Sequence, residues 1–223
     1  MTENVEGFRQ HRFTPPPTAT TVLLVRHGES VPAILGKPFP LVDGHGDPAL
    51  HDNGHHQAQQ VAARLRHERV DAIYVTNLTR TQQTAAPLAA ILGMPTTVVA
   101  DLREVFLGDW EGGLLRAKAA ANDPIYQRMR DEGRWEVIPN AETEAAFLAR
   151  CSRGLQTIVD AHPGGRVVAV VHGGVIGILL QAAAGAHRFA FNGADNASIS
   201  EVVVDGGVQM VRRFNDTAHL DLV

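Results

Sequence analysis

Cysteine is almost absent from this sequence, which contains only Cys151 in 223 residues. A single cysteine excludes an intramolecular disulfide, so a reducing cytoplasm is the expected compartment. Cys151 lies within an apolar helical pattern, which favours a buried structural thiol over a catalytic one. No apolar stretch approaches the length of a membrane span, and the N-terminus lacks the basic start and apolar core of a secretion signal. Membrane insertion and secretion are therefore not predicted.

An excess of positive charge is also missing. The formal net charge is −4 and the pI is about 6.2, so there is no general basic field for nucleic acid or anionic membranes. We expect no nucleic-acid partner and no membrane partner, and any positive potential must be local to a site. The remaining composition, 44% hydrophobic and 20% charged, is typical of a soluble globular chain, and the length suits one domain.

The first part of the chain differs from the rest. Residues 1–20 are polar, contain a run of three prolines and show no periodicity, which predicts a flexible N-terminal arm. Residues 21–223 are expected to form a single domain with a helical insert at about 114–139. The segment 31–53 is rich in Gly, Pro and His, which predicts an irregular loop.

Helical and strand patterns alternate along the predicted domain. This alternation predicts an α/β fold, a three-layer α/β/α sandwich with a mostly parallel central sheet. A final hairpin with turn glycines would add an antiparallel edge strand. Helices are expected over 54–67, 76–92, 114–130 with an interruption at Pro124, 147–159 and 175–183, and strands over 21–25, 71–75, 96–100, 166–171, 198–204 and 208–213.

Two of the predicted strands end in a histidine followed by glycine. Arg26, His27 and Gly28 follow the first strand, and His172 follows the strand at 166–171. Ligands of open α/β sheets bind beyond the carboxyl ends of the strands, so both histidines are expected near one site. Two more polar residues also follow predicted strands, and we expect the fold to bring five side chains into one pocket: Arg26, His27, Arg80, Glu104 and His172.

The chemistry of these side chains predicts a site for an anion. The guanidiniums of Arg26 and Arg80 offer fixed forks that match a phosphoryl group. A neutral imidazole is a competent nucleophile, and nearby cationic arginines would lower its pKa. A carboxylic acid supplies the proton that a departing alkoxide needs. Glu104 is the favoured acid, while Asp109 and Glu111 in the same loop stay open as alternatives.

The blocks that carry these residues resemble the histidine phosphatase superfamily, which has the phosphoglycerate-mutase-like fold. The resemblance extends from about Thr21 to the C-terminus. Ordered blocks at family-like separations are a more specific signal than any one block alone. The matching stretches are Leu24–Ser30, Asp47–Leu50, Thr79–Ala85, Leu102–Glu104 with Gly108–Gly112, and Val171–Val175.

This resemblance implies a role for each residue. His27 would be the nucleophile that becomes phosphohistidine, its ring held by backbone at the following glycine, while Arg26, Arg80 and His172 would bind the phosphoryl oxygens. Glu104 would protonate the leaving group and then activate the water that hydrolyses the intermediate. The scheme needs no metal and no cofactor, because arginines and histidines neutralise the phosphoryl charge.

The resemblance also implies an activity. The interval from Glu104 to His172 is about seventy residues, and by family analogy this short length favours a phosphatase over a mutase. Hydrolysis of a phosphomonoester of a small metabolite is the first hypothesis, and a cofactor-dependent phosphoglycerate mutase is the second. A non-catalytic member that binds a phospho-ligand or a protein ranks lower, because none of the five residues is lost. Dimers are frequent in similar proteins, so a homodimer is considered by analogy alone.

Other polar residues have an ordinary explanation beside a functional one. For a cluster of four histidines we favour solvated or substrate-facing rings over a metal site. For four basic residues of the insert we favour a solvated helix face over a second anion site. Glu142 is interpreted as a helix cap. The histidines are His45, His51, His55 and His56, and the basic residues are Arg116, Lys118, Arg128 and Arg130.

Overall fold

The computed structural model describes residues 8–221, so residues 1–7 of the predicted arm lie outside the described residues. A six-stranded sheet forms the centre, with strands β1 (Thr20–Arg26), β4 (Ala72–Val75), β5 (Thr96–Val98), β6 (Arg166–Val171), β7 (Ile199–Asp205) and β8 (Val208–Asp216). The strand order is β5-β4-β6-β1-β7-β8. The first four strands of this order are parallel, whereas β7 and β8 are antiparallel to their neighbours. The predicted α/β sandwich with an antiparallel edge is confirmed.

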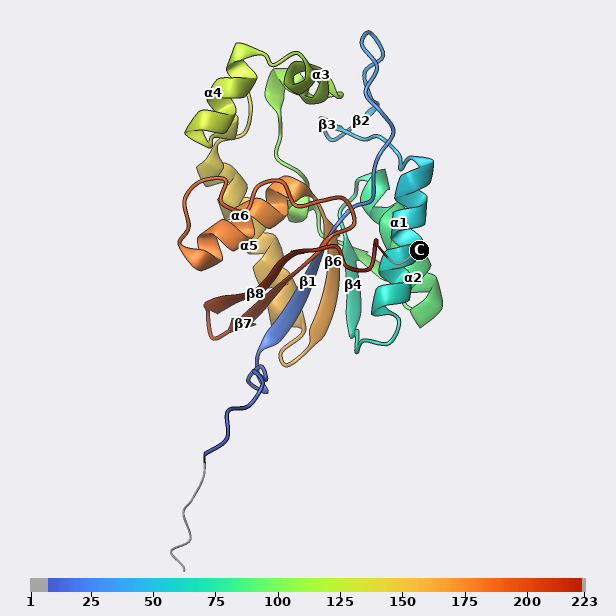
Figure 1. The fold of residues 1–223 in the computed structure, drawn as a ribbon, viewed down its shortest axis with the longest axis vertical. Helices are drawn as coiled ribbons and strands as arrows, with labels where there is room; N and C mark the ends of the chain where they lie inside the picture. Colours follow the sequence, from blue (N-terminus) through green and yellow to red (C-terminus); the bar gives the residue numbers. More distant parts are fainter. Residues whose placement is uncertain (1–7, 222–223) are drawn as a thin grey trace, which may run out of the picture.

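Helices cover both faces of the sheet (Figure 1). They are α1 (Asp52–Leu65) and α2 (Thr79–Leu92) on one face, and α5 (Glu144–Ala161) and α6 (Gly173–Ala184) on the other. Alternate residues of β1 pack on opposite sides: Leu23 and Val25 contact the α1–α2 layer, and Val22 and Leu24 contact the α5–α6 layer. A strand buried on both faces must be apolar throughout, which explains the continuous run in the sequence.

The neighbouring strands β1 and β6 end at the same level. Arg26 is aligned with Val171 in the parallel register. The backbone N–H of His27 then donates to the carbonyl oxygen of Val171 at 3.0 Å, so the ladder continues by one bond beyond the strand. His172 begins the turn into α6. The two histidine-tipped strands therefore place both rings at one edge of the sheet.

The helical insert consists of two helices, α3 (Leu114–Ala120) and α4 (Pro124–Glu132). The expected interruption at Pro124 is confirmed: α3 ends at Ala120, and Pro124 is the first residue of α4. Proline suits that position because its missing N–H is not needed there, and the Asp123 carboxylate accepts the Ile125 N–H at 2.9 Å as the cap. The insert forms the top of the molecule in Figure 1, beyond the carboxyl ends of β1 and β6.

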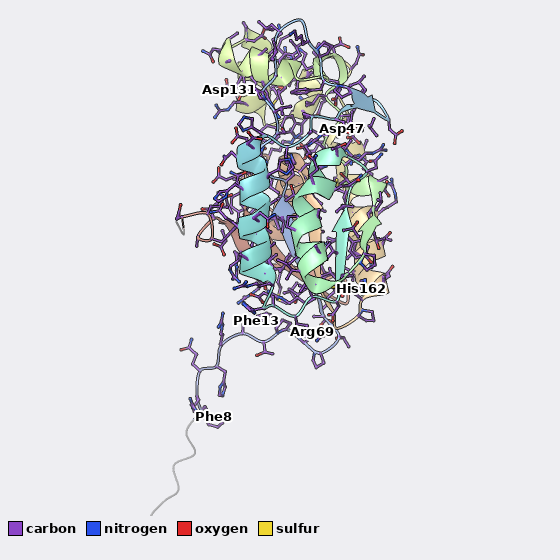
Figure 2. All side chains as sticks on the ribbon, turned by 90° about the vertical axis from the view of Figure 1, so that its right-hand side faces the viewer. Phe8, Phe13, Asp47, Arg69, Asp131 and His162 are labelled. Atoms are coloured by element: carbon purple, nitrogen blue, oxygen red, sulfur yellow. The ribbon has the colours of Figure 1, made fainter. Side chains whose placement is uncertain are left out.

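The predicted loop at 31–53 is largely irregular but contains a short hairpin, β2 (Leu41–Val42) and β3 (His45–Gly46). This hairpin lies at the same end of the molecule as the insert (Figure 1). Figure 2 shows Asp47, just after the hairpin, at this end, and His162 at the opposite end of the sheet. The hairpin and the insert therefore both lie at the end of the sheet that carries the two histidines.

Some boundaries differ from the prediction. The strand expected at 96–100 ends at Val98, because Ala100 begins a 3-10 turn. The described part of the predicted arm contacts the terminal hairpin: the Thr18 hydroxyl donates to Asp205 at 2.8 Å, and the Arg212 guanidinium lies 3.9 Å from the centroid of the Phe13 ring. Cys151 is fully buried in α5, as expected. Between residues 8 and 221, no helix combines the length and apolar character of a membrane span.

Candidate functional site

His27 is held in a single tautomer. Its Nδ1 lies 2.7 Å from the carbonyl oxygen of Gly28. A carbonyl oxygen only accepts, so Nδ1 carries the proton and Nε2 keeps its lone pair. Arg80 Nε donates to this Nε2 at 3.2 Å. The contact with Gly28 is the backbone bond that the family resemblance implies.

Burial and positive charge keep His27 neutral. The residue is only 5% exposed. Desolvation lowers its pKa well below the ordinary 6.5, and the positive charges of Arg80 and then Arg26 lower it further, while the bond to Gly28 opposes this effect. At neutral pH the ring is therefore uncharged, and its Nε2 lone pair is available for bonding to an electrophile.

His172 lies beside His27 and is fully buried. The two ring centroids are 5.2 Å apart, edge to face. His172 Nε2 is 3.1 Å from Thr76 Oγ1, whereas Nδ1 is buried and has no hydrogen-bond partner among the described residues. Burial, followed by the charge of Arg80, lowers the pKa of His172 well below 6.5. The site thus contains a second neutral imidazole with one unpaired nitrogen.

Arg26 brings a guanidinium to the same point. One of its terminal nitrogens donates to the carbonyl oxygen of Ala194, and its Nε is buried without a partner among the described residues. A Cβ on Gly173 would lie 3.3 Å from this Nε. The glycine after the second histidine therefore allows the guanidinium to lie against the backbone. Burial lowers the pKa of Arg26, but an arginine remains charged.

Arg80 stands in the first turn of α2, where a cation is unfavourable, and Asp47 offsets this cost. The Asp47 carboxylate accepts the Thr79 N–H at 2.8 Å and the Thr79 hydroxyl at 2.6 Å, and it lies 3.8 Å from an Arg80 terminal nitrogen. That nitrogen also donates to the carbonyl oxygen of Gly46 at 2.9 Å. Asp47 caps a helix from a distant loop, so no local pattern reveals its role.

Glu104 is the carboxylate that acts most strongly on the two arginines. Its charge is the largest influence raising the pKa of both Arg26 and Arg80. Its oxygens accept the N–H groups of Val105 at 2.9 Å and of Gly174 at 3.2 Å. A Cβ on Gly174 would overlap the Glu104 carboxylate. The first turn of α6 therefore holds Glu104 close to the second histidine.

The two alternative acids have other partners. Glu111 accepts the N–H of Gly46 at 2.7 Å and the N–H of Leu107 at 2.9 Å, so it ties the β2–β3 hairpin to the loop before the insert. Asp109 is exposed and accepts the side-chain amide of Asn140 at 2.9 Å. Of the three acids, Glu104 is the one whose charge acts on both Arg26 and Arg80 and whose carboxylate contacts the turn after His172.

Arg150 of α5 anchors the segment that carries Glu104. Its guanidinium donates to the carbonyl oxygens of Asp101, Arg103 and Glu104 at 2.9, 2.6 and 2.7 Å. Glu142 pairs with the same guanidinium through two bonds of 2.8 Å. A bidentate pair of this kind fixes the orientation of both side chains. Because the same guanidinium binds the three carbonyl oxygens, the pair also fixes the backbone segment that carries Glu104.

The interpretation of Glu142 as a helix cap is wrong. The cap of α5 is Thr143, whose side chain accepts the Ala146 N–H at 3.2 Å. Glu142 lies one residue earlier, and besides Arg150 it accepts the N–H of Phe106 at 3.2 Å. A carboxylate next to a helix start resembles a cap in the sequence, because the distant arginine is not visible there.

A cavity of about 160 Å³ opens beside His27. Arg26, His27, Arg80 and Glu104 line it, and His172 lies behind its wall, in edge-to-face contact with His27. The structure therefore brings together all five side chains that the sequence singled out. The rest of the wall is mainly apolar, with Phe39, Pro48, Val105, Leu107 and Leu115.

A basic residue of the insert also reaches this cavity. The Arg116 guanidinium donates to Ser30 Oγ at 2.6 Å and to the carbonyl oxygen of Val31 at 2.8 Å. Arg116 and Arg26 line both the small cavity and a neighbouring one of about 740 Å³. Arg116 is exposed, as expected for a solvated helix face, but its guanidinium also contacts the loop after β1 because α3 folds back over that loop. Lys118 instead pairs with Asp123 and Arg128 with Glu132.

The histidine cluster is dispersed in the structure. His45 is buried on the wall of the small cavity, whereas His51, His55 and His56 are exposed at the start of α1. Among the described residues, no group of three or more His, Cys, Asp or Glu side chains is arranged to hold a metal ion. His45 is the one member of this cluster that lies at the site.

Known proteins share both the sequence and the fold. The model of the histidine phosphatase superfamily (branch 1) matches residues 22–217. Phosphoglycerate mutase-like protein 4 of Arabidopsis thaliana is 34% identical over 205 residues, covering 90% of this chain and 86% of that protein. Bacillus stearothermophilus YhfR superposes with a TM-score of 0.78 at 26% identity, covering 91% of this chain and all of that one. Mycobacterial glucosyl-3-phosphoglycerate phosphatase superposes with a TM-score of 0.74 at 25% identity, covering 89% of this chain and all of that one.

We expect Arg150→Met to lower the free energy of unfolding by about 3 kcal/mol, because it leaves the half-buried Glu142 carboxylate and three carbonyl oxygens without their donor. The kcat should fall more than KM rises, since the Glu104 segment loses its anchor. Arg153→Met is the matched control: Arg153 lies on the same helix but pairs with Asp101 at the surface, at 3.3 Å, and its loss should cost under about 1 kcal/mol. Urea unfolding and steady-state kinetics measure both. Equal losses in the two variants would contradict the anchoring role.

The buried histidines also predict how stability depends on pH. A histidine whose pKa is lowered by folding is protonated first in the unfolded chain, so its stabilising effect is complete above about pH 6.5 and is lost as the pH falls below that value. Each such histidine adds a slope of about 1.4 kcal/mol per pH unit. In His172→Asn, the slope of the unfolding free energy against pH should therefore be smaller below about pH 6.5, by about 1.4 kcal/mol per pH unit. Identical slopes in wild type and variant would rule out a neutral His172.

Proposed function

Because the chain belongs to branch 1 of the histidine phosphatase superfamily, we propose that it hydrolyses phosphate monoesters of small metabolites through a phosphohistidine intermediate. One observation carries this proposal. The neutral His27, whose Nε2 lone pair accepts a hydrogen bond from Arg80, lies beside buried nitrogens of Arg26 and His172 that have no partner among the described residues. Leaving a buried donor unpaired costs about 1–3 kcal/mol. A phosphoryl group offers the oxygens that would satisfy these donors.

The proposal assigns the ring proton of His172 to Nδ1. Its Nε2 lies 3.1 Å from Thr76 Oγ1, a hydroxyl that can donate to it. The N–H at Nδ1 is then available to a phosphoryl oxygen. A neutral ring in this tautomer gives an N–H to a phosphoryl oxygen without competing as a nucleophile. The two histidines thus have opposite functions: Nε2 of His27 supplies a lone pair to phosphorus, and Nδ1 of His172 donates a hydrogen bond to a phosphoryl oxygen.

In the first step, Nε2 of His27 attacks phosphorus and the bond to the ester oxygen breaks. Glu104, in its acid form, transfers its proton to the departing oxygen. Arg80 breaks its hydrogen bond to Nε2 of His27 and donates to the phosphoryl oxygens instead. Arg26 donates to the same oxygens from the other side. The charge that develops in the transition state is stabilised by these preorganised donors.

In the second step, the Glu104 carboxylate takes a proton from water, the water oxygen bonds to phosphorus, and the bond from phosphorus to His27 breaks. Inorganic phosphate leaves and both side chains return to their first state. The cavity has a volume of only about 160 Å³ and a wall of apolar and polar side chains, which suits a small metabolite. The proposed scheme uses no metal and no cofactor, because arginines and imidazoles supply the positive charge and the donors.

A phosphoglycerate mutase is the second candidate, and Arg116 favours it. A guanidinium that lines the same cavity as Arg26 suits a substrate with a second anionic group. The relative from Arabidopsis is named for mutases, whereas the mycobacterial structure is named as a phosphatase. In a mutase, the phosphoryl group returns from His27 to the bound product instead of passing to water. We rank hydrolysis first because the interval between Glu104 and His172 is short.

Hydrolysis of p-nitrophenyl phosphate in the presence of EDTA tests the proposal. We expect turnover by the wild type, and a loss of about a thousandfold or more in His27→Ala, because the nucleophile is removed. Arg212→Ala, which changes a residue on the distant hairpin, serves as the control. Undiminished activity in His27→Ala would contradict the proposal. Conversion of 3-phosphoglycerate to 2-phosphoglycerate that depends on a bisphosphorylated primer would favour the mutase instead.

A further inference from the structure

His45 is a buried imidazole that the proposed reaction does not use. It stands on the β2–β3 hairpin and is 8% exposed. Its Nδ1 is buried and has no hydrogen-bond partner among the described residues, since the Glu111 carboxylate is 3.9 Å away. The ring packs edge-on against Phe106, with centroids 5.6 Å apart. A polar ring that is buried without a bond is costly, and this cost suggests that a ligand supplies the missing partner.

The ring lines the cavity where the ester would bind. Arg80 and Glu104 stand on the same wall. The residue after His45 is fixed on both sides: the Gly46 N–H donates to Glu111 at 2.7 Å, and the Gly46 carbonyl oxygen accepts from Arg80 at 2.9 Å. His45 is therefore held at a constant position relative to the guanidinium that contacts His27. A substrate whose phosphoryl group binds Arg80 would bring its leaving group within reach of this wall.

The charges around His45 determine what it can bind. Burial, and then the positive charges of Arg103 and Arg150, lower its pKa to about 4, while Glu142 opposes this and Arg80 adds to it. At neutral pH the ring is uncharged, so it offers one N–H donor and one lone pair. Phosphoryl oxygens only accept hydrogen bonds, and in the proposed mechanism the arginines already act as their donors. A hydroxyl group both donates and accepts, and so it matches a neutral imidazole.

We propose that His45 hydrogen-bonds a hydroxyl group of the leaving group, and that it selects phosphate esters of polyols, such as sugar or glycerol phosphates, over alkyl and aryl esters. This inference rests on the proposed phosphatase activity and names the substrate class of the same site. His45 is a specificity-determining residue, because it contacts the leaving group and takes no part in bond breaking.

Two substrates that differ only in hydroxyl groups test this inference. Glycerol 3-phosphate and n-propyl phosphate have the same three-carbon chain and the same ester. We expect the wild type to prefer the glycerol ester in kcat/KM by about tenfold or more, because a site built for a hydroxyl rejects the analogue that lacks it. His45→Phe keeps a ring against Phe106 but removes both hydrogen-bonding atoms, so the ratio should fall to near one. His45→Gln should restore part of the preference.

The control is His55→Phe, the same change at an exposed histidine of α1, which should keep the wild-type ratio. His45→Leu serves as a second apolar variant in case the larger ring disturbs folding, which circular dichroism would reveal. A wild-type ratio near one, or an unchanged ratio in both apolar variants, overturns the role of His45 while hydrolysis of both esters still supports the phosphatase. Absence of hydrolysis of either ester and of p-nitrophenyl phosphate overturns the proposed function, and the role of His45 with it.

Discussion

An uncharged imidazole held among positive charges is the constraint on which the site depends. In the proposed mechanism, His27 must keep its Nε2 lone pair while the guanidiniums of Arg26 and Arg80 bind the same phosphoryl group. Burial and those charges act in the same direction, because both lower the pKa of the ring. The bond from Nδ1 to the Gly28 carbonyl oxygen then fixes which nitrogen is free. His27 follows β1 directly, and the parallel pairing of β1 with β6 fixes the position of this strand end.

The charged residues of the site are positioned from outside it. Asp47 caps α2 and lies near Arg80, so a loop before α1 positions a guanidinium on the next helix. Arg150 and Glu142 hold the backbone that carries Glu104. A buried charge costs free energy unless it is paired, and here the pairs also set geometry. The site therefore depends on contacts between segments far apart in the sequence.

Strand ends were predictable from the sequence, but contacts between loops were not. The apolar runs before His27 and His172 are local patterns, and the parallel sheet follows from their alternation with helices. The positions of Arg116 and His45 depend on how the insert and the β2–β3 hairpin fold over the strand ends. Pro124 shows the same limit on a smaller scale: it breaks a helical pattern and also begins a new helix, and only the Asp123 cap distinguishes the two cases.

Transfer of phosphate to His27 is the central step of the proposed mechanism, and it is open to direct measurement. In Glu104→Gln, p-nitrophenyl phosphate should still react, because its leaving group needs no acid, while hydrolysis of the intermediate should slow for lack of a base. Quenching this variant in alkali and mapping its peptides by mass spectrometry should find phosphate on the peptide that contains His27, and none when His27→Asn is added. Phosphate on His172 instead, or release of nitrophenol without any phosphorylated peptide, would contradict this mechanism.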